Sequence, residues 1–211
     1  MSSAAAWQIS SAVLLLTVFA AGFAWFERSR PPARIVAAVA ALVAFAVIGR
    51  VLFAPFPNVK PTTDIVIIAG FALGFAPGWM VGVLTALVSN FYFAQGPWTP
   101  WQMLAWGLCG LLGAALARGG LNPGSSLTRR LPMALWCGAA GMAYGVIVNF
   151  GSAVNLASSD IETSFWVQTV GSLPFDIAHS IANFVFFMIA GPLLIRMLER
   201  SRRRESLVWP E

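Results

Sequence analysis

The sequence predicts an all-α integral membrane protein that crosses the bilayer several times. Hydrophobic residues make up 58% of the 211-residue chain and charged residues only 10%, whereas soluble domains carry about 25% charged residues. Apolar stretches recur from Ala12 to Leu194, which excludes a soluble domain with a single anchor. The basic residues cluster in short blocks beside these stretches, a pattern typical of membrane proteins and not of a nucleic-acid-binding surface.

Seven apolar stretches are candidate membrane spans, because a helix needs about 20 apolar residues to cross a hydrocarbon layer of roughly 30 Å. In order they are approximately Ala12–Phe26, Ile35–Phe53, Ile65–Phe75, Gly78–Phe93, Trp101–Leu116, Leu131–Phe150 and Phe175–Leu198. The first has no basic region before it, so we expect an uncleaved helix rather than a signal peptide. The third is short at about 1.5 Å per residue, and one alternative is a re-entrant hairpin that turns at Gly74, Pro77 and Gly78.

The charges favour seven crossings over the re-entrant alternative. With seven crossings, every basic residue except Arg50 and Lys60 falls on one side of the bilayer, as the positive-inside rule expects for the cytoplasmic side. A re-entrant unit would move Arg118, Arg129 and Arg130 to the other side. We therefore expect the N-terminus outside and the C-terminus in the cytoplasm. The outer loops are then Ala54–Asp64, Ala94–Pro100 and Gly151–Pro174.

Polar and aromatic side chains concentrate in the first two outer loops. The first carries Asn58 and Lys60, and the second reads Gln95-Gly96-Pro97-Trp98-Thr99-Pro100-Trp101-Gln102. Membrane proteins usually place polar groups where they handle a polar compound, so these loops predict the lid and wall of one small-molecule site. The alternatives are an interfacial aromatic belt for the tryptophans and a helix-capping box in which Gln102 is only a cap.

The last span carries Asp176, His179 and Asn183 at spacings of three and four residues, which places them on one helical face. A carboxylate inside a membrane costs about 2.5–3.5 kcal/mol on insertion scales and seldom faces lipid. We expect either ligand contacts or an internal clamp in which Asp176 orients the imidazole. No metal site is expected, because His179 is the only histidine. Cys109 and Cys137 lie in apolar stretches and are expected to be buried free thiols.

Enzyme signatures such as GxSxG, HExxH and the Walker A lysine do not occur in the sequence. We therefore expect a protein that is not an enzyme and that depends on a partner or an ion gradient for any active transport. Two alternatives stay open: a membrane enzyme with Asp176 and His179 as an acid–base pair, and a structural scaffold without a ligand. The small residues Ala37, Ala41 and Ala44 allow the close approach of another helix, from a partner or from this chain itself.

Together these features resemble the substrate-binding S components of energy-coupling factor (ECF) transporters, over a region from about Arg34 to Arg200. The segments that carry the resemblance are Ala37 and Ala41, Pro57-Asn58-Val59-Lys60-Pro61, the glycines Gly70, Gly74, Gly78 and Gly82 with Ser89-Asn90-Phe91, the segment from Gln95 to Gln102, and Pro174-Phe175-Asp176 with His179 and Asn183. The resemblance implies a six-helix membrane core with an outward-facing pocket. The pocket walls that it implies are Asn58, Lys60, Asn90, Gln95, Trp98, Gln102, Trp106, Asp176, His179 and Asn183.

The resemblance implies an S-component-like domain at 31–200, followed by a basic cytoplasmic tail at 201–211. The chain departs from the family pattern by an extra N-terminal transmembrane helix at 1–30, to which the resemblance gives no role. The protein would import a vitamin or related micronutrient across a bacterial cytoplasmic membrane. Ala37 and Ala41 would dock onto a transmembrane T component, and two cytoplasmic ATPases would drive transport. No cofactor is implied, since the vitamin is the transported substrate. Cobalamin or another corrinoid is the first expectation, with riboflavin, thiamine precursors and other small heterocycles as alternatives.

Overall fold

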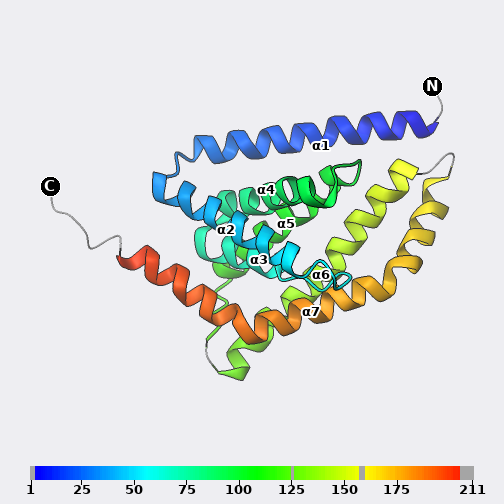
Figure 1. Cartoon of the computed structure of the whole chain (residues 1–211). Coiled ribbons are helices and arrows are strands. Elements are labelled where there is room, and N and C mark those ends of the chain that lie inside the picture. Colours follow the sequence, from blue (N-terminus) through cyan, green and yellow to red (C-terminus); the bar gives the residue numbers. More distant parts are fainter. Residues whose placement is uncertain (1–2, 125, 157–159, 205–211) are drawn as a thin grey trace.

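The computed structural model describes residues 3–124, 126–156 and 160–204, whose regular structure is entirely helical (Figure 1). The helices are α1 (Ser3–Arg28), α2 (Ala33–Leu52), α3 (Thr62–Leu73), α4 (Phe75–Phe93), α5 (Thr99–Arg118), α6 (Leu127–Leu156) and α7 (Ile161–Arg204). Within this described part of the chain, six helices are long and apolar enough to cross a membrane, and α3 is shorter, with 12 residues. The predicted class, an all-α membrane protein, is confirmed at this level.

Most of the predicted outer loop Gly151–Pro174 is helical, and the prediction is wrong there. The helix α6 continues to Leu156 and α7 begins at Ile161. Pro174 lies inside α7, where membrane helices tolerate proline because neighbouring helices and polar side chains satisfy the freed backbone groups. Figure 1 shows α7 bending in its second half, the half that contains Pro192. Proline is a common cause of such a kink.

The first turn of α3 buries residues that the sequence placed in an outer loop. Thr62, Thr63 and Asp64 begin this helix and are at most 3% exposed. The expectation that Asp64 belongs to the loop is therefore wrong, because the chain enters the bundle at the first turn of α3. The carboxyl oxygens of Asp64 lie beside the thiol of Cys137, in an environment of buried side chains. Cys109 and Cys137 are both buried and free, as predicted.

Glycines let α3, α4 and α5 pack backbone against backbone. Gly74 makes the turn between α3 and α4 with a φ of 96°, a conformation that glycine adopts without the steric penalty of a Cβ. A Cβ on Gly70 would overlap the carbonyl oxygen of Gly110, and a Cβ on Gly110 would overlap that of Gly78. Small residues permit this close approach of membrane helices. The three helices therefore form a compact unit with little room for added atoms.

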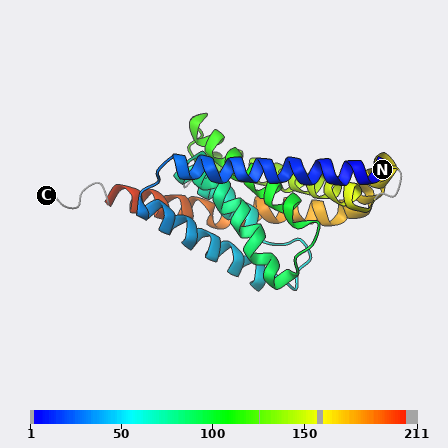
Figure 2. The ribbon, with the colours of Figure 1, turned by 90° about the horizontal axis from the view of Figure 1, so that it is seen from above.

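The N-terminal helix α1 packs on α4, with smaller contacts to α5 and α6. Its buried face carries Leu15 and Phe19, and a Cβ on its Gly22 would overlap the indole of Trp79. Figures 1 and 2 show α2 diverging from α1 after the turn that joins them. The face of α2 with Ala37 and Ala41 is consequently exposed, and α1 does not cover it.

We predict that Gly110→Ala lowers the stability of the folded chain by about 1–3 kcal/mol, the usual cost of forcing atoms into a packed interior. The added methyl group would meet the backbone of Gly78, which cannot move aside as a side chain can. Gly171→Ala is the matched control, because a Cβ at Gly171 meets no atom within 4 Å. Thermal unfolding in detergent micelles measures the difference. Equal midpoints for the two variants would contradict the close packing.

Candidate functional site

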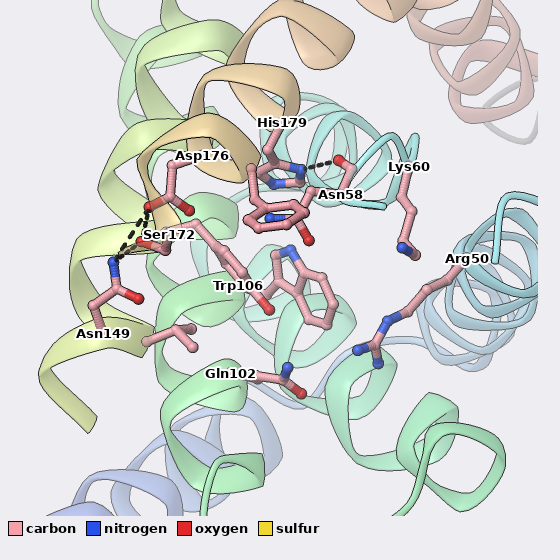
Figure 3. Close-up of a pocket in the computed structure, with 13 residues that line it drawn as sticks. Arg50, Asn58, Lys60, Gln102, Trp106, Asn149, Ser172, Asp176 and His179 are labelled. Carbon is pink, nitrogen blue, oxygen red and sulfur yellow. Dashed lines mark hydrogen bonds between the residues drawn. The ribbon is translucent and has the colours of Figure 1, made fainter. Parts of the chain in front are cut away.

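A polar cavity of about 310 Å³ lies between α2, α5, α6, α7 and the loop that joins α2 to α3 (Figure 3). Its lining comes from the last turn of α2, the first turns of α5, the second half of α6 and the first half of α7, so it occupies one end of the bundle. Its polar side chains are Arg50, Asn58, Lys60, Gln102, Asn149, Ser172, Asp176 and His179, and its larger apolar or aromatic ones are Trp106, Tyr144, Val148 and Phe175.

The cavity brings together some of the residues that the resemblance implied as pocket walls and leaves others out. The ones that line it are Asn58, Lys60, Gln102, Trp106, Asp176 and His179. The ones that lie outside its lining are Asn90, Gln95, Trp98 and Asn183. The two predicted loops therefore contribute unequally, since the first supplies lining residues directly and the second supplies none before the start of α5.

Both ring nitrogens of His179 are held by residues far away in the sequence. Nδ1 lies 2.8 Å from the carbonyl oxygen of Asn58, and Nε2 lies 3.0 Å from Oγ1 of Thr63. The indole Nε1 of Trp106 donates to the same hydroxyl oxygen at 3.0 Å. Asn58 has a φ of 56°, in the left-handed region where asparagine is enriched among non-glycine residues. One imidazole thus connects the α2–α3 loop with α3 and, through Thr63, with α5.

These contacts place a proton on Nδ1 of His179. A carbonyl oxygen only accepts, so Nδ1 donates to Asn58. An indole N–H only donates, so the Thr63 hydroxyl accepts from Trp106 and keeps its own hydrogen available for Nε2. Both ring nitrogens are therefore engaged in hydrogen bonds within the protein.

Asp176 is bonded to different partners, and the predicted clamp between Asp176 and His179 is wrong. Its Oδ2 accepts hydrogen bonds from Ser172 Oγ at 2.6 Å and from Asn149 Nδ2 at 3.2 Å. Asn149 also donates to the Ser172 hydroxyl at 2.7 Å. Asp176 and His179 share a helical face, as predicted. The carboxylate is held by α6 and by the preceding turn of α7, whereas the imidazole is held by the α2–α3 loop and by α3.

Asn90 and Gln95 belong to a hydrogen-bonded cluster beside the cavity. The side-chain amide of Asn90 donates to Thr99 Oγ1 at 2.9 Å and to Gln102 Oε1 at 2.8 Å, and its oxygen accepts from Arg50 at 2.8 Å. The Thr99 hydroxyl donates to Gln95 Oε1 at 2.9 Å. Asn90 is fully buried. Asn90 therefore positions Arg50 and Gln102, which do line the cavity, and Gln95 supports Asn90 through Thr99.

Trp98 and Asn183 lie apart from the cavity for different reasons. Trp98 is 41% exposed, and its ring lies over Gly96. Asn183 is fully buried between α6 and α7, next to Gly141. The capping box predicted for Thr99 and Gln102 is not formed, because α5 begins at Thr99 without a side-chain cap and Gln102 binds Asn90 instead.

Sequence reasoning missed several lining residues, namely Arg50, Tyr144, Asn149 and Ser172. A signal existed for Arg50, because an ionisable residue inside a membrane span marks a functional site by default. Tyr144 has no such signal in the sequence. Its ring lies 4.9 Å from that of Trp106 and 5.4 Å from that of His179, measured between centroids. The cavity therefore has one aromatic wall built from three helices.

Two basic side chains, Arg50 and Lys60, line the side of the cavity that lies away from Asp176. The Arg50 guanidinium lies over the rings of Phe93 and Trp106, at 4.5 and 4.9 Å from their centroids. Lys60 lies in the loop, and its ammonium makes one long hydrogen bond, of 3.4 Å, to the carbonyl oxygen of Phe56. Burial lowers the pKa of Lys60, and the positive charge of Arg50 lowers this pKa further. These two like charges therefore repel each other on this side of the cavity.

No group of three or more His, Cys, Asp or Glu side chains that could hold a metal ion occurs within residues 3–124, 126–156 and 160–204. Comparisons of the chain with protein-family models, with curated proteins and with solved structures found no match. Any assignment of function to this cavity therefore depends on its own geometry and chemistry.

We predict that Thr63→Val destabilises the protein by about 2–5 kcal/mol. Valine has nearly the shape of threonine but leaves Trp106 Nε1 and His179 Nε2 buried without a partner, and each such loss costs about 1–3 kcal/mol. Thr62→Val is the matched control, since the buried hydroxyl of Thr62 makes no hydrogen bond. Unfolding free energies of both variants in micelles provide the test, and equal losses would refute the network.

Proposed function

We propose that the chain is the substrate-binding S component of an ECF-type importer in a bacterial cytoplasmic membrane. The observation that carries this proposal is a polar cavity of about 310 Å³ within a bundle of apolar helices. Burying so many polar groups between membrane helices is expensive unless they serve a polar compound. Binding of a small molecule is the function that accounts for the cavity best, and the resemblance described above supplies the transport context.

The position of the cavity supports an outward-facing binding site. The cavity is at the end of the bundle where α2 ends and α5 begins, whereas Arg28, Arg118 and Arg196 lie at or near the opposite helix ends. The positive-inside rule assigns the arginine-rich end to the cytoplasm. The cavity then faces the outside, where an importer must collect its substrate.

The size of the cavity narrows the substrate class. Ligand pockets range from about 300 to 1,000 Å³, and a volume of about 310 Å³ is at the lower limit of this range. A corrinoid, with its macrocycle and amide side chains, needs a much larger space. We therefore propose a single small heterocycle of vitamin size in place of the corrinoid that the sequence suggested first.

The exposed face of α2 supports docking to a transmembrane partner. Ala37, Ala41 and Ala44 lie opposite the side of the helix that buries Val39 and Val43. Small side chains that point away from the bundle allow another helix to approach closely. We propose that this face contacts a T component, and that two ATPases associated with it drive transport.

The alternative of an acid–base enzyme has less support. An acid–base pair of Asp176 and His179 needs a nitrogen that can exchange a proton with a substrate. Both nitrogens of His179 are instead hydrogen-bonded to the protein, and Asp176 binds Ser172 and Asn149. A ligand-free scaffold would not require the polar cavity.

We predict that the chain, expressed alone and purified in detergent, retains a small organic compound at about one molecule per chain. Mass spectrometry of compounds released by denaturation measures this, with a membrane protein of similar size purified in the same way as the control. A chain that stays empty after purification and after incubation with a panel of vitamins would contradict a binding function and favour the scaffold.

We further predict that Ala41→Leu abolishes uptake of that compound by cells while the purified variant still binds it. The larger side chain would keep a partner helix away from α2 without reaching the cavity. Ala20→Leu is the matched control, because Ala20 is exposed on α1. Normal uptake by the Ala41 variant would remove the docking role, and loss of binding would indicate that this face packs within the protein.

A further inference from the structure

The guanidinium of Arg50 is buried, and the partners of its hydrogen bonds and ring contacts among the described residues are all neutral. Its side chain is 8% exposed, and Nη1 donates to the hydroxyl of Ser89 and to Oδ1 of Asn90. Its faces are covered by Phe93 and Trp106. A buried charge is normally paired with an opposite charge. Here the remaining edge of Arg50 faces the cavity.

Lys60 reaches the same side of the cavity from the loop. Its one hydrogen bond, to Phe56, is long and comes from its own segment, so the ammonium has spare donors. Figure 3 shows Arg50 and Lys60 on one side of the cavity, with Asp176 on the other and Trp106 between them. The acidic group of the site therefore does not neutralise its basic groups.

Asp176 is equipped to accept one further hydrogen bond. Ser172 and Asn149 both donate to its Oδ2, and Oδ1 lies against Gly145, another lining residue. Only glycine at position 145 leaves room for the Asp176 carboxyl group, since a Cβ there would overlap it. A compound in the cavity can thus meet positive charge at one side and a carboxylate at the other.

We propose that the compound bound in this cavity carries an oxyanion, a carboxylate or a phosphate, that binds to Arg50 and Lys60. Its ring lies against the aromatic wall of Trp106 and Tyr144, and an N–H or O–H group on its far side donates to Asp176. Arginine and lysine together bind oxyanions through charge-assisted hydrogen bonds, which are about twice as strong as neutral ones. This inference depends on the proposed binding function and specifies its substrate class.

The depressed pKa of Lys60 agrees with this assignment. Burial and the neighbouring charge of Arg50 both disfavour the protonated ammonium and lower this pKa. An oxyanion between the two residues reverses the second effect, because an opposite charge nearby favours the charged form. The pair is therefore more stable with an anion than without one.

The experiment compares the wild-type chain with Lys60→Gln, Lys60→Arg and Arg196→Gln, all in lipid nanodiscs. Each is incubated with a small-molecule extract of bacterial cells, washed, denatured and analysed by mass spectrometry. A parallel extract is first treated with alkaline phosphatase, which removes phosphate esters and leaves carboxylates intact. Arg196 is exposed at the far end of α7, so Arg196→Gln controls for the loss of one positive charge from the chain. Lys60→Arg changes the side chain at position 60 but keeps its positive charge.

The expected result is a retained compound with a carboxylate or phosphate that is held by the wild type, by Arg196→Gln and by Lys60→Arg. Lys60→Gln should retain it about 10- to 100-fold more weakly, the loss expected for one hydrogen bond to a charged group. Loss of the compound after phosphatase treatment assigns a phosphate, and survival assigns a carboxylate. A retained compound without either group, or equal retention by Lys60→Gln, overturns this inference but leaves the binding function. No retained compound overturns both.

Discussion

The cavity depends on the two hydrogen bonds of the His179 imidazole. Without a partner from each side, a buried imidazole would lose more free energy than it gains from packing. Asn58 and Thr63 provide these partners from a loop and from the first turn of α3, and Trp106 completes the set from α5. These hydrogen bonds join the four residues in one network. The loop that covers the cavity is thereby tied to α7.

The glycine contacts of α3, α4 and α5 provide the support for this arrangement. Thr63 is a useful partner for His179 only if α3 stays at a fixed distance from α7, and α3 is held against α5 through Gly70 and Gly110. Protein interiors are packed so tightly that such elements move as units. On the other side of the cavity, α6 and α7 form their own extensive contact. The cavity therefore lies between two packed parts of the bundle, joined at its centre by hydrogen bonds.

The helices could be predicted from the sequence because each apolar stretch is long compared with its polar connections. The prediction failed where polar residues continue a helix. Ser172 falls in a predicted outer loop, yet it lies on α7 and donates a hydrogen bond to Asp176. The site was found in part because Asn58, Lys60 and His179 are polar residues in or next to apolar segments. Tyr144 and Asn149 depend on how α6 packs, which no local pattern in the sequence reveals.

Arg50 and Lys60 play different electrostatic roles in such a site. Arginine keeps its charge in proteins under all ordinary conditions, and here the rings of Phe93 and Trp106 and the oxygens of Ser89 and Asn90 stabilise it without neutralising it. Lysine changes its protonation more readily when buried, and Lys60 is on a loop rather than in a helix. One cation is therefore a fixed part of the cavity wall. Burial and the charge of Arg50 lower the pKa of the other, and an anion between the two cations would favour its charged form.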